Sequence, residues 1–142
     1  MEKIRVLVVD DDRTWHDIYK LICGRDYAMS FAIGVEGALR SIEDRRPDAV
    51  ATDYWLSDGT AACLVPELKK EGIPYILVSS ERLDRPFREK LVSECIDPGC
   101  FLDKSRLYNA FRPALEKAME ENRSEAASED GDEIGSAELV GI

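Results

Sequence analysis

Short apolar runs alternate with amphipathic segments along most of this chain. The apolar runs predict strands at about residues 3–9, 28–33, 48–53, 74–79 and 99–103. Between them, apolar residues recur at three- and four-residue spacing, which predicts helices at about 13–24, 35–45, 60–71 and 84–95, and a last helix that begins near Ser105. Strands that alternate with helices are typical of a parallel sheet with helices on both faces. We therefore predict a doubly wound α/β fold with a five-stranded parallel sheet.

The pattern changes near the end of the chain. Pro113 falls inside the last predicted helix, where it favours a bend or a restart, and Ser105 is a suitable N-cap. Residues 120–142 carry eight acidic residues and one basic residue, and after about Glu121 the segment is rich in Ser, Ala and Gly. Such a composition buries too little apolar surface to offset the entropy of ordering. We predict a folded domain over residues 1–119 and a disordered acidic tail over residues 120–142.

Composition narrows the classes of function. The 142 residues suit one domain, and a net charge of −10 argues against binding to nucleic acid or to an anionic membrane. No run approaches the roughly 18 apolar residues of a membrane span, and the N-terminus lacks a signal-peptide pattern. We therefore expect a cytoplasmic protein. The four cysteines form no C-x-x-C pair, so we expect buried free thiols; they are Cys23, Cys63, Cys95 and Cys100.

Two residues around the first predicted helix have ordinary structural interpretations. Asp12 lies directly before that helix, where a carboxylate caps free amides and favours the helix dipole. His16 is the single histidine and has no second metal-type ligand nearby, so we expect it at the surface.

Four of the predicted strands end on residues suited to phosphoryl chemistry. Asp10 and Asp11 follow the first strand, Asp53 ends the third, Ser79 ends the fourth and Lys104 follows the fifth. The carboxyl ends of parallel strands meet at one edge of a sheet, where ligands bind. Three carboxylates suit a hard divalent cation such as Mg²⁺, and a carboxylate can carry a covalent phosphoryl group. An ammonium and a hydroxyl can bind phosphoryl oxygens.

This ordered set of residues resembles the receiver domains of response regulators in two-component signalling, over residues 3 to about 119. The resemblance implies a flavodoxin-like strand order of 2-1-3-4-5. It also implies a signalling switch in which Asp53 accepts a phosphoryl group from a histidine kinase or a histidine phosphotransfer protein in a phosphorelay. A downstream protein target would then read the shifted face of the fourth helix, fifth strand and fifth helix. The expected chemistry is self-phosphorylation and self-dephosphorylation, not turnover of a separate substrate.

The same resemblance implies a role for each residue of the site. Asp10, Asp11 and Asp53 would bind Mg²⁺ together with the backbone carbonyl of Trp55. Ser79 and Lys104 would contact the phosphoryl group, and Ser79 would act as a switch residue. Phe101 lies three residues before Lys104, where the family often has an aromatic residue that rotates inward on activation.

The chain departs from the family pattern around the acceptor. The loop from Asp53 to Gly59 is shorter by two residues, with Ser57 in place of a proline, and Ser105 replaces the proline that usually follows the lysine. Trp55 lies two residues after the acceptor, facing the phosphoryl group in this family. Its indole would either shield the acyl phosphate from water or serve as a packing or partner-contact residue.

Two other functions fit parts of the sequence. The first is a receiver-like module that binds a partner without phosphorylation. The second is a haloacid-dehalogenase-like phosphatase, because Asp10, Asp12 and Thr14 fit its D-x-D-x-T signature. That family needs a further acidic pair at a strand end after the lysine, whereas Asp130 and Asp132 fall in the acidic tail. It also leaves Asp53 unexplained.

Overall fold

The computed structural model describes the backbone of residues 2–141 and the side chains of residues 2–127. Five parallel strands form one sheet in the order β2-β1-β3-β6-β7. They are β1 (Ile4–Val9), β2 (Tyr27–Ala32), β3 (Ala49–Thr52), β6 (Tyr75–Ser79) and β7 (Phe101–Asp103). This is the predicted strand order, and the strand boundaries differ from the predicted ones by at most two residues.

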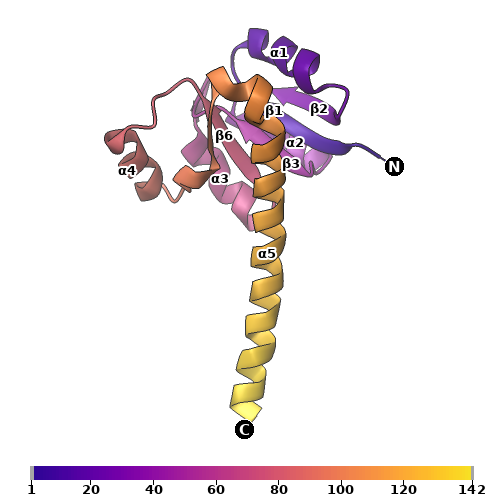
Figure 1. Cartoon of the computed structure of the whole chain (residues 1–142), viewed down its shortest axis with the longest axis vertical. Coiled ribbons are helices and arrows are strands. Elements are labelled where there is room, and N and C mark those ends of the chain that lie inside the picture. The colour runs from indigo at the N-terminus through magenta and orange to yellow at the C-terminus, as the bar shows by residue number, and fades with distance from the viewer. Residues whose placement is uncertain (1, 142) are drawn as a thin grey trace.

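Helices cover both faces of the sheet (Figure 1). They are α1 (Arg13–Cys23), α2 (Val35–Asp44), α3 (Ala61–Lys70), α4 (Arg85–Ser93) and α5 (Leu107–Gly141), with short 3-10 turns η1 (Pro98–Cys100) and η2 (Lys104–Arg106). One core packs the sheet against α2, α3 and α4, and the other packs it against α1 and α5. The doubly wound fold is confirmed.

The central strands explain why the apolar runs are continuous. Val6–Val9 of β1 are fully buried, and all four residues of β3 are buried. Val6 and Val8 join the core under α1 and α5, while Leu7 and Val9 join the opposite core. Because both faces are covered here, Val6–Val9 are all apolar and β3 holds only small or apolar residues and one threonine, while the carboxylates come directly after these buried runs.

The shortened loop after β3 forms a small hairpin that the sequence did not reveal. Its strands are β4 (Trp55–Leu56) and β5 (Gly59–Thr60), which pair antiparallel. The carboxylate of Asp58 accepts hydrogen bonds from the amides of Val35 (2.6 Å) and Glu36 (3.0 Å), and so caps α2. A Cβ atom at Gly34 would lie 2.4 Å from Asp58 Oδ1, so any other residue there would displace the capping carboxylate. The hairpin is therefore tied to the start of α2.

The start of the last helix differs from the prediction. The side chain of Asp103 accepts a hydrogen bond from the amide of Ser105 (2.8 Å), so Asp103 caps η2 and Ser105 lies inside that turn. The predicted N-cap at Ser105 is wrong because the aspartate two residues earlier takes the role. Pro113 lies inside α5 without interrupting it. The carbonyl of Asn109, which loses its helical partner to the proline, belongs to an exposed residue that water can reach.

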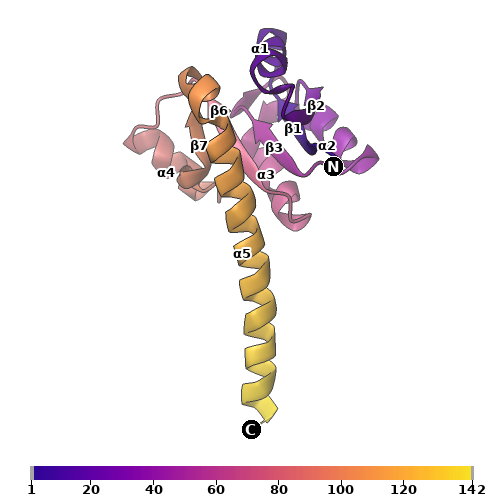
Figure 2. The same ribbon diagram turned by 45° about the vertical axis from the view of Figure 1, so that its right-hand side comes forward.

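The C-terminal helix projects well beyond the sheet (Figures 1 and 2). Its backbone is helical through Gly141, which differs from the disorder predicted after about Glu121. Residues 120–127 are exposed except for half-buried Asn122, whose amide donates a hydrogen bond to the carbonyl of Gly72 (3.2 Å). Side chains from residue 128 onward, including Asp130 and Asp132, lie outside the described residues. The domain boundary at residue 119 stays a prediction.

The cysteines only partly match their prediction. All four are free; Cys23 is buried and Cys100 half-buried, but Cys63 and Cys95 are exposed. Cys63 lies on the outer side of α3, and Cys95 follows the end of α4 in a left-handed backbone conformation (φ 60°). Adjacency to apolar residues did not imply burial, because neighbouring helix positions point in different directions. Within residues 2–141, no helix has the length and apolar character needed to cross a bilayer.

Candidate phosphoryl-transfer site

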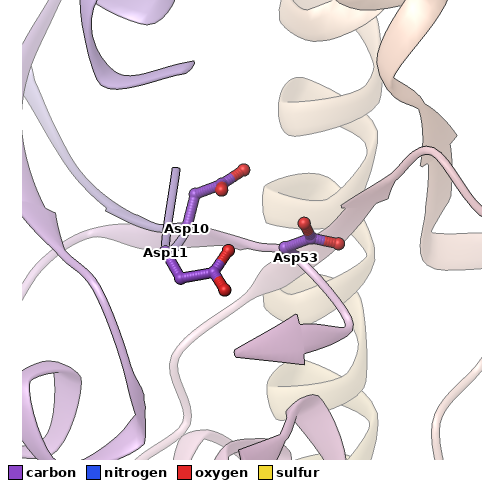
Figure 3. A group of neighbouring side chains, drawn as sticks. All are labelled: Asp10, Asp11 and Asp53. Carbon is purple, nitrogen blue, oxygen red and sulfur yellow. The ribbon is translucent and has the colours of Figure 1, made fainter. Parts of the chain in front are cut away.

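Three carboxylates meet at the carboxyl edge of the sheet, as Figure 3 shows. Asp10 and Asp11 follow β1, and Asp53 follows β3. One oxygen from each lies within 4.8 Å of the others. The amide of Asp53 donates to the carbonyl of Val9 (2.8 Å), which continues the pairing of β1 with β3 and fixes the acids beside each other. The predicted convergence of these three residues is therefore observed.

Lys104, which directly follows β7, completes the centre of the site. Its Nζ lies 2.7 Å from Asp10 Oδ2 and 2.7 Å from Asp53 Oδ2. The side chain of Lys104 is only 6% exposed, and its Nζ lies 4.8 Å from the centroid of the Trp15 ring on α1. One ammonium therefore links the ends of β1, β3 and β7 under an aromatic cover.

Burial and pairing set the charges of this group. Burial raises the pKa of Asp10, against the opposing effects of hydrogen bonds with Lys104 and the Asp12 amide. Burial alone would lower the pKa of Lys104, but its hydrogen bonds with Asp10 and Asp53 outweigh this and the pKa lies above the usual 10.5. Lys104 is thus charged at neutral pH. A single ammonium beside three carboxylates leaves negative charge that a divalent cation can offset.

Asp53 has both carboxylate oxygens engaged. Oδ2 pairs with Lys104, and Oδ1 accepts a hydrogen bond from the amide of Tyr54 (2.7 Å). The Asp53 side chain is 12% exposed, so it is held in place while keeping a path to solvent. Ser79 is buried at the end of β6, and its Oγ accepts a hydrogen bond from the amide of Glu81 (3.3 Å). Both residues lie at the edge that the sequence predicted.

Trp55 and Phe101 lie toward α4. Phe101 is half-buried, and its ring makes an edge-to-face contact with Phe87 of α4 at 6.3 Å between centroids. The indole of Trp55 is 49% exposed, and its Nε1 donates to Glu81 Oε1 (2.8 Å). The indole therefore contacts the loop between β6 and α4. The predicted metal contact of the Trp55 carbonyl stays a prediction.

His16 is a residue of the site that the sequence reasoning misplaced at the surface. It is only 8% exposed, its Nε2 lies 2.7 Å from the carbonyl oxygen of Asp10, and its ring packs on Phe31. The prediction was wrong because His16 shares one helix face with buried Tyr19 and Cys23. That spacing was visible in the sequence. Asp12 caps α1 as predicted, by accepting a hydrogen bond from the Thr14 amide (2.9 Å).

The donor set fits a hard divalent cation. The candidate ligands among the described residues are carboxylate oxygens, which Mg²⁺ prefers. The ammonium of Lys104 contacts Oδ2 of Asp10 and Oδ2 of Asp53. Asp11 is exposed, so a cation can reach the three carboxylates from solvent on that side. Asp10, Asp11 and Asp53 can therefore hold a cation next to the same carboxylate that Lys104 contacts.

Comparison with solved structures identifies the fold as that of receiver domains. The signal receiver domain of an HD-domain-containing protein from Pseudomonas fluorescens Pf-5 superposes with a TM-score of 0.74 at 20% identity, covering 87% of this chain and 99% of that one. A CheY-like response regulator receiver domain protein from Methanospirillum hungatei JF-1 gives 0.73 at 20% identity, with the same coverage. A response regulator receiver domain protein from Clostridium thermocellum gives 0.70 at 19% identity, covering 84% and 97%. No protein-family model matches the chain, and no curated protein matches it.

Proposed function

We propose that this protein is a phosphorylation-controlled signalling switch in which Asp53 accepts a phosphoryl group from a phosphohistidine. The observation that carries the proposal is the double contact of Lys104. Its ammonium bridges Asp10 and Asp53 at 2.7 Å each, beside Asp11, within a receiver fold. Asp10 is buried and the Asp53 side chain is only 12% exposed, and strand ends rarely gather such acids without a role for them, because buried charge is costly.

The proposed reaction follows from these positions. An oxygen of Asp53 attacks phosphorus, the P–N bond of the phosphohistidine breaks, and the leaving imidazole keeps the electron pair and takes up a proton. Lys104 moves its hydrogen bond from Asp53 Oδ2 to a phosphoryl oxygen while it keeps Asp10 as a partner. A Mg²⁺ ion held by Asp10, Asp11, Asp53 and the Trp55 carbonyl would offset the phosphoryl charge. Hydrolysis later returns the Asp53 carboxylate and releases inorganic phosphate.

The output is proposed to be a protein contact. The kinase or histidine phosphotransfer protein reaches Asp53 from the open side of the site, and a downstream protein reads the face of α4, β7 and α5. The four free thiols suit a reducing compartment, so the proposal places the protein in the cytoplasm. Chemistry is limited to gaining and losing the phosphoryl group on Asp53.

The phosphatase alternative loses support. Asp12, the second aspartate of the D-x-D-x-T signature, caps α1 through the Thr14 amide. Among residues 2–141, no strand follows β7 to carry the further acidic pair that such enzymes need. Asp53, unexplained by that alternative, lies at the centre of the observed cluster.

The test is intact-protein mass after incubation with acetyl phosphate or phosphoramidate and Mg²⁺. Asp53→Asn is the test variant. Asp58→Asn is the matched control, because it makes the same change in the neighbouring hairpin, outside the acidic cluster. We expect one labile phosphoryl group on the parent and on Asp58→Asn, and none on Asp53→Asn. Two results contradict the proposal: no gain of phosphoryl mass in the folded parent from either donor, or an equal gain in Asp53→Asn. The first result is the one that a phosphorylation-independent module would give.

A further inference from the structure

Helix α4 is weakly attached to the rest of the domain. Of its nine residues only Leu91 is buried, and the helix lies at the outer edge of the molecule in Figures 1 and 2. An exposed loop precedes it, and Cys95, in a left-handed conformation, follows it. Elements with few buried contacts open at low free-energy cost. The contacts that do hold α4 therefore decide its position.

Several of those contacts come from Tyr54, the residue directly after Asp53. The Tyr54 hydroxyl donates to Glu94 Oε1 (2.5 Å) at the C-terminal end of α4. The Tyr54 ring meets Phe87 edge to face, at 5.1 Å between centroids. The ammonium of Lys90 lies 5.4 Å from the centroid of the same ring. Positions 87, 90 and 94 follow helical spacing, so three side chains on one face of α4 contact Tyr54.

Trp55 contacts both α4 and the loop that precedes it. Lys90 Nζ lies 4.9 Å from the Trp55 ring centroid, so the ammonium contacts both aromatic rings. The Trp55 Nε1 donates to Glu81 in the loop that leads into α4. We call Tyr54 and Trp55, with their partners Glu81, Phe87, Lys90 and Glu94, the α4 clamp.

The clamp is joined to the acceptor through the backbone. The amide of Tyr54 donates to Asp53 Oδ1 (2.7 Å), a hydrogen bond strengthened by the carboxylate charge. The Tyr54 side chain is fully buried, and burial together with the Glu94 hydrogen bond raises its pKa to about 12. A close-packed, hydrogen-bonded ring has no free volume in which to absorb a shift of its backbone.

We propose that Tyr54 and Trp55 couple the state of the Asp53 carboxylate to the position of α4. An acyl phosphate carries less negative charge on Oδ1 than a carboxylate does, so the bond from the Tyr54 amide weakens and the clamp rearranges. This route differs from the one expected through Ser79 and Phe101, because it begins at the Tyr54 amide on Asp53 Oδ1 and reaches α4 directly through the Tyr54 side chain. Its use in signalling rests on the proposed function, but the coupling itself is a property of the unmodified chain.

The first test is a double-mutant cycle that needs no phosphorylation. Amide hydrogen exchange of residues 85–93 is measured by mass spectrometry in the parent, Asp53→Ala, Tyr54→Phe and the double variant. Tyr75→Phe is the matched control, because Tyr75 is a second buried tyrosine, on β6, whose pKa is also raised to about 12. Loss of a hydrogen bond to a charged group should raise the exchange rate of α4 about tenfold in Tyr54→Phe. Asp53→Ala should raise the exchange rate of α4 when Tyr54 is present, but should raise it little further in the Tyr54→Phe background.

Two outcomes of this cycle overturn the proposal. One is α4 exchange in Tyr54→Phe that stays at the level of the parent and of Tyr75→Phe. The other is independent action, in which the effects of Asp53→Ala and Tyr54→Phe simply multiply.

A second arm separates this proposal from the proposed function. The parent and Tyr54→Phe are incubated with acetyl phosphate and Mg²⁺, labelling is measured by intact mass, and α4 exchange is measured again. We expect equal labelling, with a change in α4 exchange in the parent that is largely lost in the variant. An equal change in both labelled proteins overturns the coupling and leaves the switch function standing. Absent labelling together with a non-additive cycle overturns the switch function and supports the coupling.

Discussion

The ammonium of Lys104 lies 2.7 Å from Asp53 Oδ2, and this contact joins residues 51 positions apart in the sequence. The same ammonium contacts Asp10, so one side chain balances two buried carboxylates. A phosphoryl group on Asp53 must take over one of these contacts. The ion pair between Lys104 and Asp53 is therefore a feature of the unphosphorylated state of the proposed switch, and it is the first interaction that phosphorylation changes.

Removing the Lys104 charge should destabilise the domain. Lys104→Met leaves Asp10 and Asp53 buried without a counter-charge, which costs about 3 kcal/mol of unfolding free energy. Mg²⁺ should recover more stability in this variant than in the parent, because the cation then balances carboxylates that have no other partner. Urea denaturation with and without Mg²⁺ measures both effects. Lys117→Met, at an exposed lysine, is the control, and an equal response to Mg²⁺ in all three proteins contradicts this account.

The left-handed backbone at Cys95 should be relieved by glycine. A non-glycine residue at φ 60° costs about 1 kcal/mol, so Cys95→Gly should raise the unfolding free energy by about that amount. The matched control is Cys63→Gly, at an exposed position inside α3, where glycine should lower it by a similar amount. Denaturant unfolding compares the two, and equal signs for both substitutions contradict the assignment of strain to Cys95.

The cap that Asp58 provides should make stability depend on pH. Hydrogen bonds from the amides of Glu36 and Val35 lower the pKa of Asp58 below its usual 3.8. A lowered folded-state pKa means that the stabilisation is present above pH 3.8 and is lost as pH falls through the folded-state value. Asp58→Asn should therefore lower the Tm at pH 7, and its deficit should shrink in strongly acidic buffer. A deficit that is constant with pH, or one matched by exposed Asp17→Asn, counts against the cap.

The indole of Trp55 should lengthen the life of the phosphorylated form. Trp55 is the second residue after the acceptor, and a hydrogen bond to Glu81 holds its indole in place. We expect an indole at this position to limit the approach of water to the phosphoryl group on Asp53. After the phosphodonor is removed, loss of the phosphoryl group is followed by intact mass. Phosphorylated Trp55→Asn should decay several-fold faster than the parent, whereas Trp15→Phe, which keeps an aromatic ring over Lys104, should not. Equal half-lives of the parent and Trp55→Asn would show that Trp55 only packs.

The sequence predicted those parts of the site that strand ends determine. Asp10 and Asp53 follow apolar runs buried on both faces, and Lys104 follows a short strand at the sheet edge, so their convergence follows from strand ends that meet at one edge of the sheet. The Asp58 cap on α2 was not predictable in this way, because it joins positions 23 residues apart through a hairpin without a strong pattern. His16 was expected at the surface because no second metal-type ligand lies nearby, although its helical spacing with Tyr19 and Cys23 indicated burial. Asp103 and Ser105 are both suitable N-cap residues for the turn before the last helix, and the sequence alone does not decide which of them caps it. In the structure Asp103 does.

The most direct test of the central claim is to locate the phosphoryl group. Borohydride reduces an acyl phosphate to the alcohol, so a phosphorylated aspartate becomes homoserine, which tandem mass spectrometry identifies by position. The protein is treated with acetyl phosphate and Mg²⁺, reduced and digested. We predict homoserine at residue 53, and none there when Mg²⁺ is omitted or when Asp53 is replaced by Asn. Homoserine at Asp10 or Asp11 with Asp53 intact, or at no position in a protein that gains phosphoryl mass, would contradict the account.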